Sequence, residues 1–348
     1  MSVVNELART ARSAAHLPGA RRPCPACRRD EDESVLADRD DGAVVRHGEA
    51  VAKAHAPGTD PNGHRARLAV ASDPLLAGIL LPPLPLDAPD VHGRPVTAWP
   101  YGAPVDPEDP DAAPWEEAAV LLARLHRVDV AALPGPLPPM RGPAKVARAL
   151  ARMESVAGEH PAAAVVRRAW DRLPAWARDV TASPREETPS PRQETASPLE
   201  ETASSREDTA TPRDALCHGD LHLGQLVRHP APSGPWLLID VDDLGVGDPA
   251  WDLARPAAWY AAGLLAPQIW QRFLGAYIAE QGPAVPVDGD PWPQLDVPAR
   301  ALTVQTAALS LARAIAEKRE TDEVDQMMID ACARIVDLPP ELEFEPPS

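Results

Sequence analysis

Two aspartates follow short apolar stretches in the second half of the chain. Asp220 ends the sequence LCHGD, and Asp240 ends WLLID twenty residues later. Phosphoryl transfer needs such a pair, because one carboxylate can orient and deprotonate an attacking hydroxyl while the other holds Mg²⁺ against nucleotide phosphates. Gln225 lies five residues after Asp220, and its side-chain carbonyl can occupy a second metal position. The spacing therefore predicts a phosphoryl-transfer site.

Neighbouring polar residues have more modest interpretations. We interpret His218 as a hydrogen-bonded organiser of the loop that carries Asp220, in preference to an acid or base. His222 can face an acceptor or solvent, and the residues leave both open. Asp242 and Asp243 are interpreted as turn residues that could also lend charge to a metal. Asp248 and Asp252, in the sequence GDPAWDLA, are expected to fix the turn and the start of the following helix.

The sequences HGDLHLGQ and IDVDDLGVGDPAWDLA resemble the aminoglycoside phosphotransferase-like kinases, which are related to choline kinases and more distantly to protein kinases. The resemblance covers about residues 34–337. It implies that Asp220 is the catalytic base and Asp240 the principal Mg²⁺ ligand. Gln225 stands where the family usually has Asn, one methylene further from the metal.

The resemblance also implies residues for the nucleotide. Lys53, in the stretch AVAKAH, matches the lysine that pairs with nucleotide phosphates. Trp99 to Gly102, including Tyr101, resembles the hinge under the adenine ring. The resemblance further implies ATP or GTP as the donor, Mg²⁺ as the metal, and a hydroxyl of a small molecule as the acceptor: an aminoglycoside-like compound, a sugar or an amino alcohol.

Two departures from the family pattern concern the nucleotide site. Kinase-like folds pair the strand lysine with a helix Glu, but no Glu occurs between Glu49 and Glu108. Either Asp60 or Asp73 substitutes for it, or the pair is absent. The loop DRDDG, at 38–42, carries three acids, which would repel a triphosphate. A nucleotide-binding pseudokinase is therefore a second hypothesis.

The elements that must position these residues fall into two kinds. Short runs separated by Gly-containing turns predict antiparallel strands before residue 102. Apolar residues at helical spacing predict helices from Pro114 onward, with short strands around the two aspartates. Strands followed by helices predict an α+β, two-lobed protein-kinase-like fold, with a small antiparallel-sheet N-terminal lobe and a larger helical C-terminal lobe.

We expect four regions along the chain. Residues 1–30 are predicted to be a mobile arm, 31–102 the nucleotide-binding lobe, and 103–182 with 214–340 the catalytic and acceptor-binding lobe. Residues 183–213 form an imperfect seven-residue repeat rich in Pro, Glu, Ser and Thr, with Leu199 as its one large apolar side chain. Such a segment buries too little apolar surface to fold, so we expect a disordered insertion. A third hypothesis makes this repeat the functional part of an interaction protein.

The composition limits the partners. The 348 residues carry a net charge of −18, which argues against a nucleic-acid or anionic-membrane binder. No run of 18 apolar residues occurs and the first residues lack the apolar centre of a signal peptide, so we expect a cytoplasmic protein. The sequence does not indicate an oligomeric state.

Cys24 and Cys27 form a CxxC pair, which is half of a tetrahedral zinc site. His47 and His55 could complete it. The alternative is an unligated pair in the N-terminal arm.

Overall fold

The computed structural model describes residues 2–16, 24–28, 33–39, 42–86, 90–178 and 214–338. The repeat at 183–213 therefore lies outside the described residues. Contacts divide the chain into two compact units, Met1–Gly142 with Ala215–Ala299 and Pro143–Asp214 with Arg300–Ser348. All the predicted site residues belong to the first unit. The lobe boundaries predicted from the sequence stay a prediction.

An antiparallel five-stranded sheet is built from the first part of the chain, in the order β1-β2-β3-β5-β4. The strands are β1 (Ser34–Arg39), β2 (Gly42–His47), β3 (Ala50–Ala54), β4 (Asp90–Val91) and β5 (Arg94–Pro100). In β2 and β3 buried and half-buried residues alternate, so each strand presents one set of side chains to either face. Ala43, Val45, Ala52 and Ala54 fall on one face, and Lys53 falls on the other.

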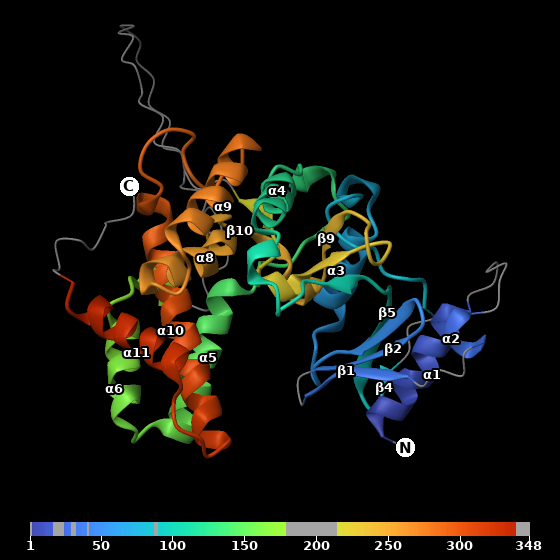
Figure 1. Ribbon diagram of the computed structural model, residues 1–348, viewed down its shortest axis with the longest axis horizontal. Coiled ribbons are helices and arrows are strands. Elements are labelled where there is room, and N and C mark those ends of the chain that lie inside the picture. Colours follow the sequence, from blue (N-terminus) through green and yellow to red (C-terminus); the bar gives the residue numbers. More distant parts are fainter. Residues whose placement is uncertain are drawn as a thin grey trace, which may run out of the picture. The chain divides into compact units, whose positions relative to one another are not determined.

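Helix α1 (Val3–Ala15) packs on the alanine-rich face of this sheet (Figure 1). The side chain of Ser2 caps it by accepting a hydrogen bond from the Asn5 backbone N–H, and Leu7 and Ala11 are fully buried. The prediction of a mobile arm is therefore wrong for these residues. Among the buried residues of α1, only Leu7 is a large apolar residue. The sheet offers small side chains, so the helix can approach it closely without larger ones.

Smaller sheets and helices complete the first unit. Strand β7 (Ala215–Cys217) pairs with β10 (Gly245–Gly247), and β8 (Leu226–Arg228) lies between β6 (Ala103–Pro104) and β9 (Trp236–Leu238). The helices are α2 (Pro25–Arg28), α3 (Pro61–Ala71), α4 (Trp115–His126), α8 (Ala250–Ala262) and α9 (Pro267–Ala279). Single-turn helices run over Pro74–Leu76 (η1), Pro110–Ala112 (η2), Val130–Ala132 (η3), Leu223–Gln225 (η4) and Val241–Asp243 (η5).

Helices dominate the second unit. They are α5 (Gly142–Ala157), α6 (Pro161–Asp171), α7 (Ala175–Arg178) and α11 (Glu323–Val336), with most of α10 (Trp292–Ala316). Helix α11 packs against α6. It starts at a capping box in which Asp322 and Asp325 each accept a hydrogen bond from the other's backbone N–H. Within the described residues no helix is long and apolar enough to cross a membrane.

Candidate active site

Lys53 meets two aspartates. Its Nζ donates to Asp240 Oδ1 at 2.6 Å and lies 2.9 Å from Asp242 Oδ2. Burial alone would lower the pKa of Lys53, but the charges of the two carboxylates outweigh burial and raise it. The lysine is therefore a permanent cation that neutralises one of two neighbouring negative charges.

Asp240 holds a rare backbone conformation. Its φ of 64° lies in the left-handed region, which Asp tolerates better than most residues. This conformation ends the extended stretch after β9 and starts the single turn η5, where the Asp242 N–H approaches Asp240 Oδ1 at 3.4 Å. The sharp turn brings both carboxylates to Lys53. The sequence interpretation of Asp242 as a turn residue describes its backbone but omits this ion pair.

His55 extends the same network. It lies two residues after Lys53, its Nδ1 is 2.8 Å from Asp242 Oδ1, and its Nε2 is 2.8 Å from Thr97 Oγ1. His55 therefore belongs to the lysine cluster, and the hypothesis that it completes a zinc site with the CxxC pair is wrong. Its position two residues after Lys53, directly after the end of β3, was the signal that could have placed it here.

His64 of α3 packs edge-on against His55, with ring centroids 4.4 Å apart. Burial and the neighbouring His55 lower the pKa of His64 to about 4. Burial likewise opposes ionisation of Asp242, but hydrogen bonding to His55 and the charge of Lys53 hold the pKa of that carboxyl well below its usual range. The histidine pair is thus a feature of this site that sequence reasoning missed.

The two aspartates considered as substitutes for a helix Glu have other contacts. Asp60 caps α3 by accepting hydrogen bonds from the backbone of Asn62 and Gly63, and Asp73 caps η1 through the Leu75 N–H. The carboxylate partners of Lys53 come instead from the loop after β9. The missing Glu therefore does not leave the lysine unpaired.

A buried carboxylate organises the loop that carries Asp220. Asp252, at the start of α8, accepts the backbone N–H groups of His218 and Gly219 at 2.6 and 2.7 Å. Its Oδ2 is also 3.0 Å from Nε2 of His126, whose Nδ1 lies 2.7 Å from the Tyr277 hydroxyl. Burial disfavours the ionised form of Asp252, but hydrogen bonding to His126 outweighs burial and lowers the pKa of this carboxyl.

His218 links this loop to the strand before Asp240. Its Nε2 donates to the Ile239 carbonyl at 2.8 Å, and the residue is fully buried. Gly219 approaches the other side of the same region: its φ is +81°, and a Cβ there would lie 2.3 Å from the Asp243 carbonyl oxygen. The loops that carry Asp220 and Asp240 therefore touch, and only glycine permits the contact.

Asp220 pairs with an arginine that sequence reasoning missed. The guanidinium of Arg255, on α8, donates to Asp220 Oδ1 at 2.8 Å and to the Leu221 carbonyl at 3.0 Å. Two donations from one guanidinium fix both the side chain and the backbone of the loop. The RP dipeptide after the GDPAWDLA motif gave no signal for this role.

Gln225 lies beside the second aspartate. Its backbone carbonyl oxygen accepts a hydrogen bond from the Ile239 N–H at 2.9 Å, which puts residue 225 opposite the stretch that leads into Asp240. Gln225 is buried, and the Asp240 side chain is 33% exposed. Carboxylate and amide oxygens are the donors that Mg²⁺ prefers, so the residues present fit that ion.

The predicted hinge joins two sheets. Trp99 is buried in β5 and its indole N–H donates to Thr97 Oγ1 at 2.8 Å. The Arg46 guanidinium lies 3.3 Å from the centroid of the Tyr101 ring, and the Tyr101 N–H donates to the Glu49 carbonyl. Gly102 passes so close to Val227 that a Cβ would lie 2.4 Å from it. A contact of Trp99 or Tyr101 with adenine stays a prediction.

A small pocket adjoins the Asp220 loop. Its walls include the indoles of Trp115 and Trp259, together with Leu221, His222 and Arg255. Because Leu221 and His222 directly follow Asp220, the pocket opens beside the predicted catalytic base.

Comparisons with known proteins identify the family and the fold of the chain. The model of the phosphotransferase enzyme family matches residues 43–292. The chain belongs to this family, and it is a phosphotransferase. No curated protein sequence matches the chain.

Solved structures show the same fold at low identity. A choline/ethanolamine kinase family protein from Mesorhizobium loti is 16% identical with a TM-score of 0.51, covering 96% of this chain and 95% of its own. A thermostable mutant of aminoglycoside phosphotransferase APH(4)-Ia, in its apo form, is 15% identical with a TM-score of 0.52, covering 88% and 94%. A ternary complex of this enzyme (N203A) with AMP-PNP and hygromycin B is 15% identical with a TM-score of 0.52. The match covers 88% of this chain and 93% of that one.

Three predictions from the sequence are thereby confirmed: the family, the α+β kinase-like fold with an antiparallel-sheet N-terminal lobe, and the phosphotransferase class.

Proposed function

We propose that this enzyme transfers the γ-phosphoryl group of ATP, bound with Mg²⁺, to a hydroxyl of a small molecule. The observation that carries the proposal is the ion pair between Lys53 and Asp240, since it joins the residue expected at the phosphates to the one expected at the metal. An ATP analogue bound to the APH(4)-Ia mutant of the same fold supports ATP as the donor.

The chain's own residues then have defined tasks. Asp240 and Gln225 hold Mg²⁺, which when bound neutralises phosphate charge and orients the leaving group. Lys53 leaves its two carboxylates in part and pairs with the phosphates. In the absence of nucleotide these carboxylates keep the buried lysine compensated, which avoids the cost of an unpaired buried charge.

Asp220 accepts the proton of the attacking hydroxyl. Arg255 donates to one of its oxygens at 2.8 Å, which fixes the orientation of the carboxylate. Asp252 and His218 position this loop through the backbone and touch neither substrate. Most of the acceleration comes from positioning and from charge stabilisation, as in other phosphoryl transfers.

The acceptor approaches Asp220 from the side of the small pocket that Trp115 and Trp259 line. Aromatic side chains can bind the apolar faces of sugar rings and attract an ammonium group, which is compatible with an aminoglycoside-like compound, a sugar or an amino alcohol. The amide Gln225, placed where the family usually has Asn, provides the second metal position.

Thermal unfolding with ATP or GTP, each with and without Mg²⁺, tests the donor site. A ligand at 100 times its Kd stabilises the folded state by about 2.7 kcal/mol. We expect stabilisation by ATP with Mg²⁺ and its loss in Asp240→Ala. Release of ADP in the presence of aminoglycosides, sugars and amino alcohols then identifies the acceptor. The absence of stabilisation by either nucleotide would favour a pseudokinase.

A further inference from the structure

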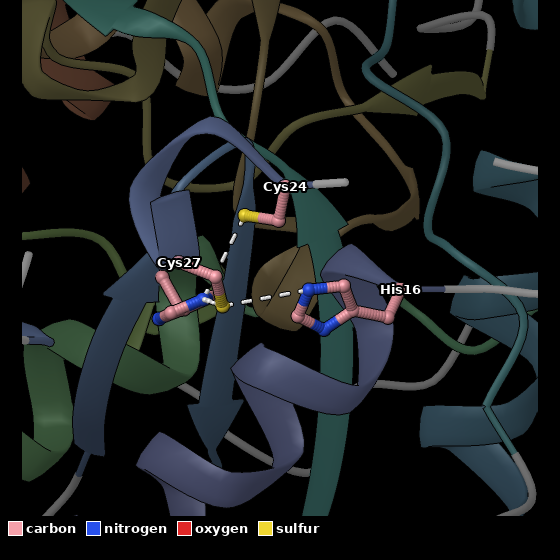
Figure 2. Close-up of side chains that lie close together, drawn as sticks. His16, Cys24 and Cys27 are labelled. Atoms are coloured by element: carbon pink, nitrogen blue, oxygen red, sulfur yellow. Dashed lines mark hydrogen bonds between the residues drawn. The ribbon is translucent and has the colours of Figure 1, made fainter. Parts of the chain in front are cut away.

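Four metal-binding side chains converge at the end of helix α1. His16 is the C-cap of α1, Cys24 directly precedes α2, Cys27 lies in α2, and His47 is the last residue of β2. One ligand atom from each lies within 4.8 Å of every other. Figure 2 shows His16, Cys24 and Cys27 with their side chains turned toward one another.

The distances suit a tetrahedral ion. Cys27 Sγ lies 3.2 Å from His47 Nε2 and 3.5 Å from His16 Nε2, and Cys24 Sγ lies 3.7 Å from His47 Nε2. Tetrahedral angles with Zn–S of about 2.3 Å and Zn–N of about 2.05 Å require S···N separations of about 3.6 Å. Three sulfur–nitrogen separations are therefore close to those of a zinc site, and all four ligand atoms lie within 4.8 Å of one another.

The hydrogen bonds of His16 direct the correct nitrogen inward. Its Nδ1 lies 2.7 Å from the Arg12 carbonyl oxygen. A carbonyl only accepts, so Nδ1 carries the proton and Nε2, which faces Cys27, is left with its lone pair. Zinc-binding histidines commonly donate their second nitrogen to a carbonyl or carboxylate in this way.

His47 has the corresponding arrangement on the buried side. Its Nδ1 is buried, makes no hydrogen bond, and lies 3.6 Å from Glu33 Oε1. Arg12 in turn holds that carboxylate, with its Nε 3.0 Å from Glu33 Oε1. A carboxylate facing Nδ1 favours the proton on that nitrogen, which again leaves Nε2 for the cluster.

The local backbone accommodates the sulfur atoms. Gly48 follows His47 with φ of +57°, and a Cβ there would lie 2.9 Å from Cys24 Sγ. The turn between β2 and β3 is thus open on the side where Cys24 is buried. Cys27 and His16 are the exposed members, which gives an ion access from solvent.

The donor set selects the ion. Two thiolates balance the charge of a divalent cation, and a closed set of two sulfurs and two imidazole nitrogens is typical of structural zinc, whereas Mg²⁺ prefers oxygen. We propose that His16, Cys24, Cys27 and His47 bind one Zn²⁺, which fastens α1 and α2 to the hairpin of β2 and β3.

Such an ion would explain the order of α2. A helix of four residues has no stability of its own, and Cys24 and Ala26 are its buried apolar contacts among side chains that the structure describes. Zinc ligands contribute folding free energy directly. The site is separate from Lys53, which lies on the opposite face of the sheet from α1.

Metal analysis of the full chain, purified without chelator, tests the proposal, with Co²⁺ titration of the metal-free reduced protein as the spectroscopic probe. We expect one Zn²⁺ per chain, and with Co²⁺ the visible bands of a tetrahedral ion plus a thiolate charge-transfer band. Cys27→Ser and His16→Ala change exposed side chains, so both should stay folded. Each should weaken Co²⁺ binding by more than the roughly 10- to 100-fold typical of losing an outer hydrogen-bond partner.

Cys332→Ala is the matched control, because Cys332 lies in α11, outside the cluster. It should keep the full metal content and the same Co²⁺ spectrum. Asp240→Ala should also keep its zinc, which separates this proposal from the proposed activity. Reduced wild-type protein that takes up no Co²⁺, a Cys24–Cys27 disulfide in place of a metal site, or an unchanged spectrum in Cys27→Ser would each overturn it.

Discussion

Lys53 and Asp240 are 187 residues apart in the sequence, and their side chains are 2.6 Å apart in the structure. Asp242 Oδ2 also lies 2.9 Å from the Lys53 Nζ. The lysine and the two aspartates together therefore carry one net negative charge. Free nucleotide would be repelled by that charge and Mg²⁺ attracted to it. On the proposed function, we therefore expect the nucleotide to enter together with the metal.

Asp240→Ala should abolish stabilisation by Mg²⁺ and ATP, because it removes the principal metal ligand and half of the compensation of Lys53. The midpoint of thermal unfolding with and without ligand measures the effect. Asp129→Ala, which removes an exposed cap of η3, is the control and should keep the shift. Stabilisation that persists in Asp240→Ala would move the metal site elsewhere.

Asp220→Asn should lower kcat by about 10²- to 10⁴-fold, the range of a lost general base. Nucleotide binding should change little, since Asp240 and Lys53 are untouched. Once an acceptor is known, steady-state kinetics and ATP titration separate the two quantities. Near-wild-type turnover in this variant would exclude Asp220 as the base.

Lys53→Met should raise the KM for ATP, because the phosphates lose their cation. It should also strengthen the binding of Mg²⁺ alone, since Asp240 and Asp242 lose the charge that neutralises them. Calorimetric titration with Mg²⁺ in the absence of nucleotide measures this second effect. Weaker Mg²⁺ binding than in the wild type would show that the carboxylates do not form the metal site.

Arg255→Ala should lower kcat and leave nucleotide binding intact, because Asp220 and the Leu221 carbonyl lose their common donor. Arg255→Lys should recover only part of the activity, since an ammonium group cannot reproduce a two-pronged guanidinium contact. A pH profile of kcat is the discriminating measurement. Removing the positive charge of Arg255 should move the fall of kcat at low pH, its acid limb, to higher pH. An unchanged limb would mean that Arg255 acts on packing alone.

His64 should make stability depend on pH. Its pKa of about 4 in the folded state lies below the ordinary value of 6.5, so the unfolded chain takes up a proton first as pH falls. The stability present above pH 6.5 is lost between about pH 6.5 and 4, by about 1–2 kcal/mol at pH 5. Denaturant unfolding at pH 7 and pH 5 should show a smaller difference in His64→Gln. An equal difference in both proteins would contradict the shift.

The sequence predicted the loops that carry Asp220 and Asp240 better than the partners of these residues. Asp220 follows β7, Asp240 follows β9, and Gln225 directly precedes β8, so local motifs indicate their positions. Arg255 and Asp252 act across 33 to 35 residues through the fold, and no local pattern announces such contacts. His55 was visible in the strand register but was assigned to the wrong cluster.

The helices and strands show the same division. Asp60 caps α3 and Pro61 is its first residue, a pattern that the sequence itself displays because capping is a local effect. Helix α1 was missed because its burial depends on the alanines of a sheet that the sequence places about forty residues later. The fourth member of the cysteine cluster, His16, was missed for the same reason, since it lies at the end of that helix.

The alanine face under α1 has a practical consequence for anyone who shortens this protein. Ala43, Val45, Ala52 and Ala54 are almost completely buried, and Leu7 and Ala11 cover them. Trimming the chain to residue 17 would expose this patch to water on the back of the strand that carries Lys53. Exposed apolar patches on sheets promote aggregation. Poor solubility would therefore be the first effect of removing α1, ahead of any loss of catalysis.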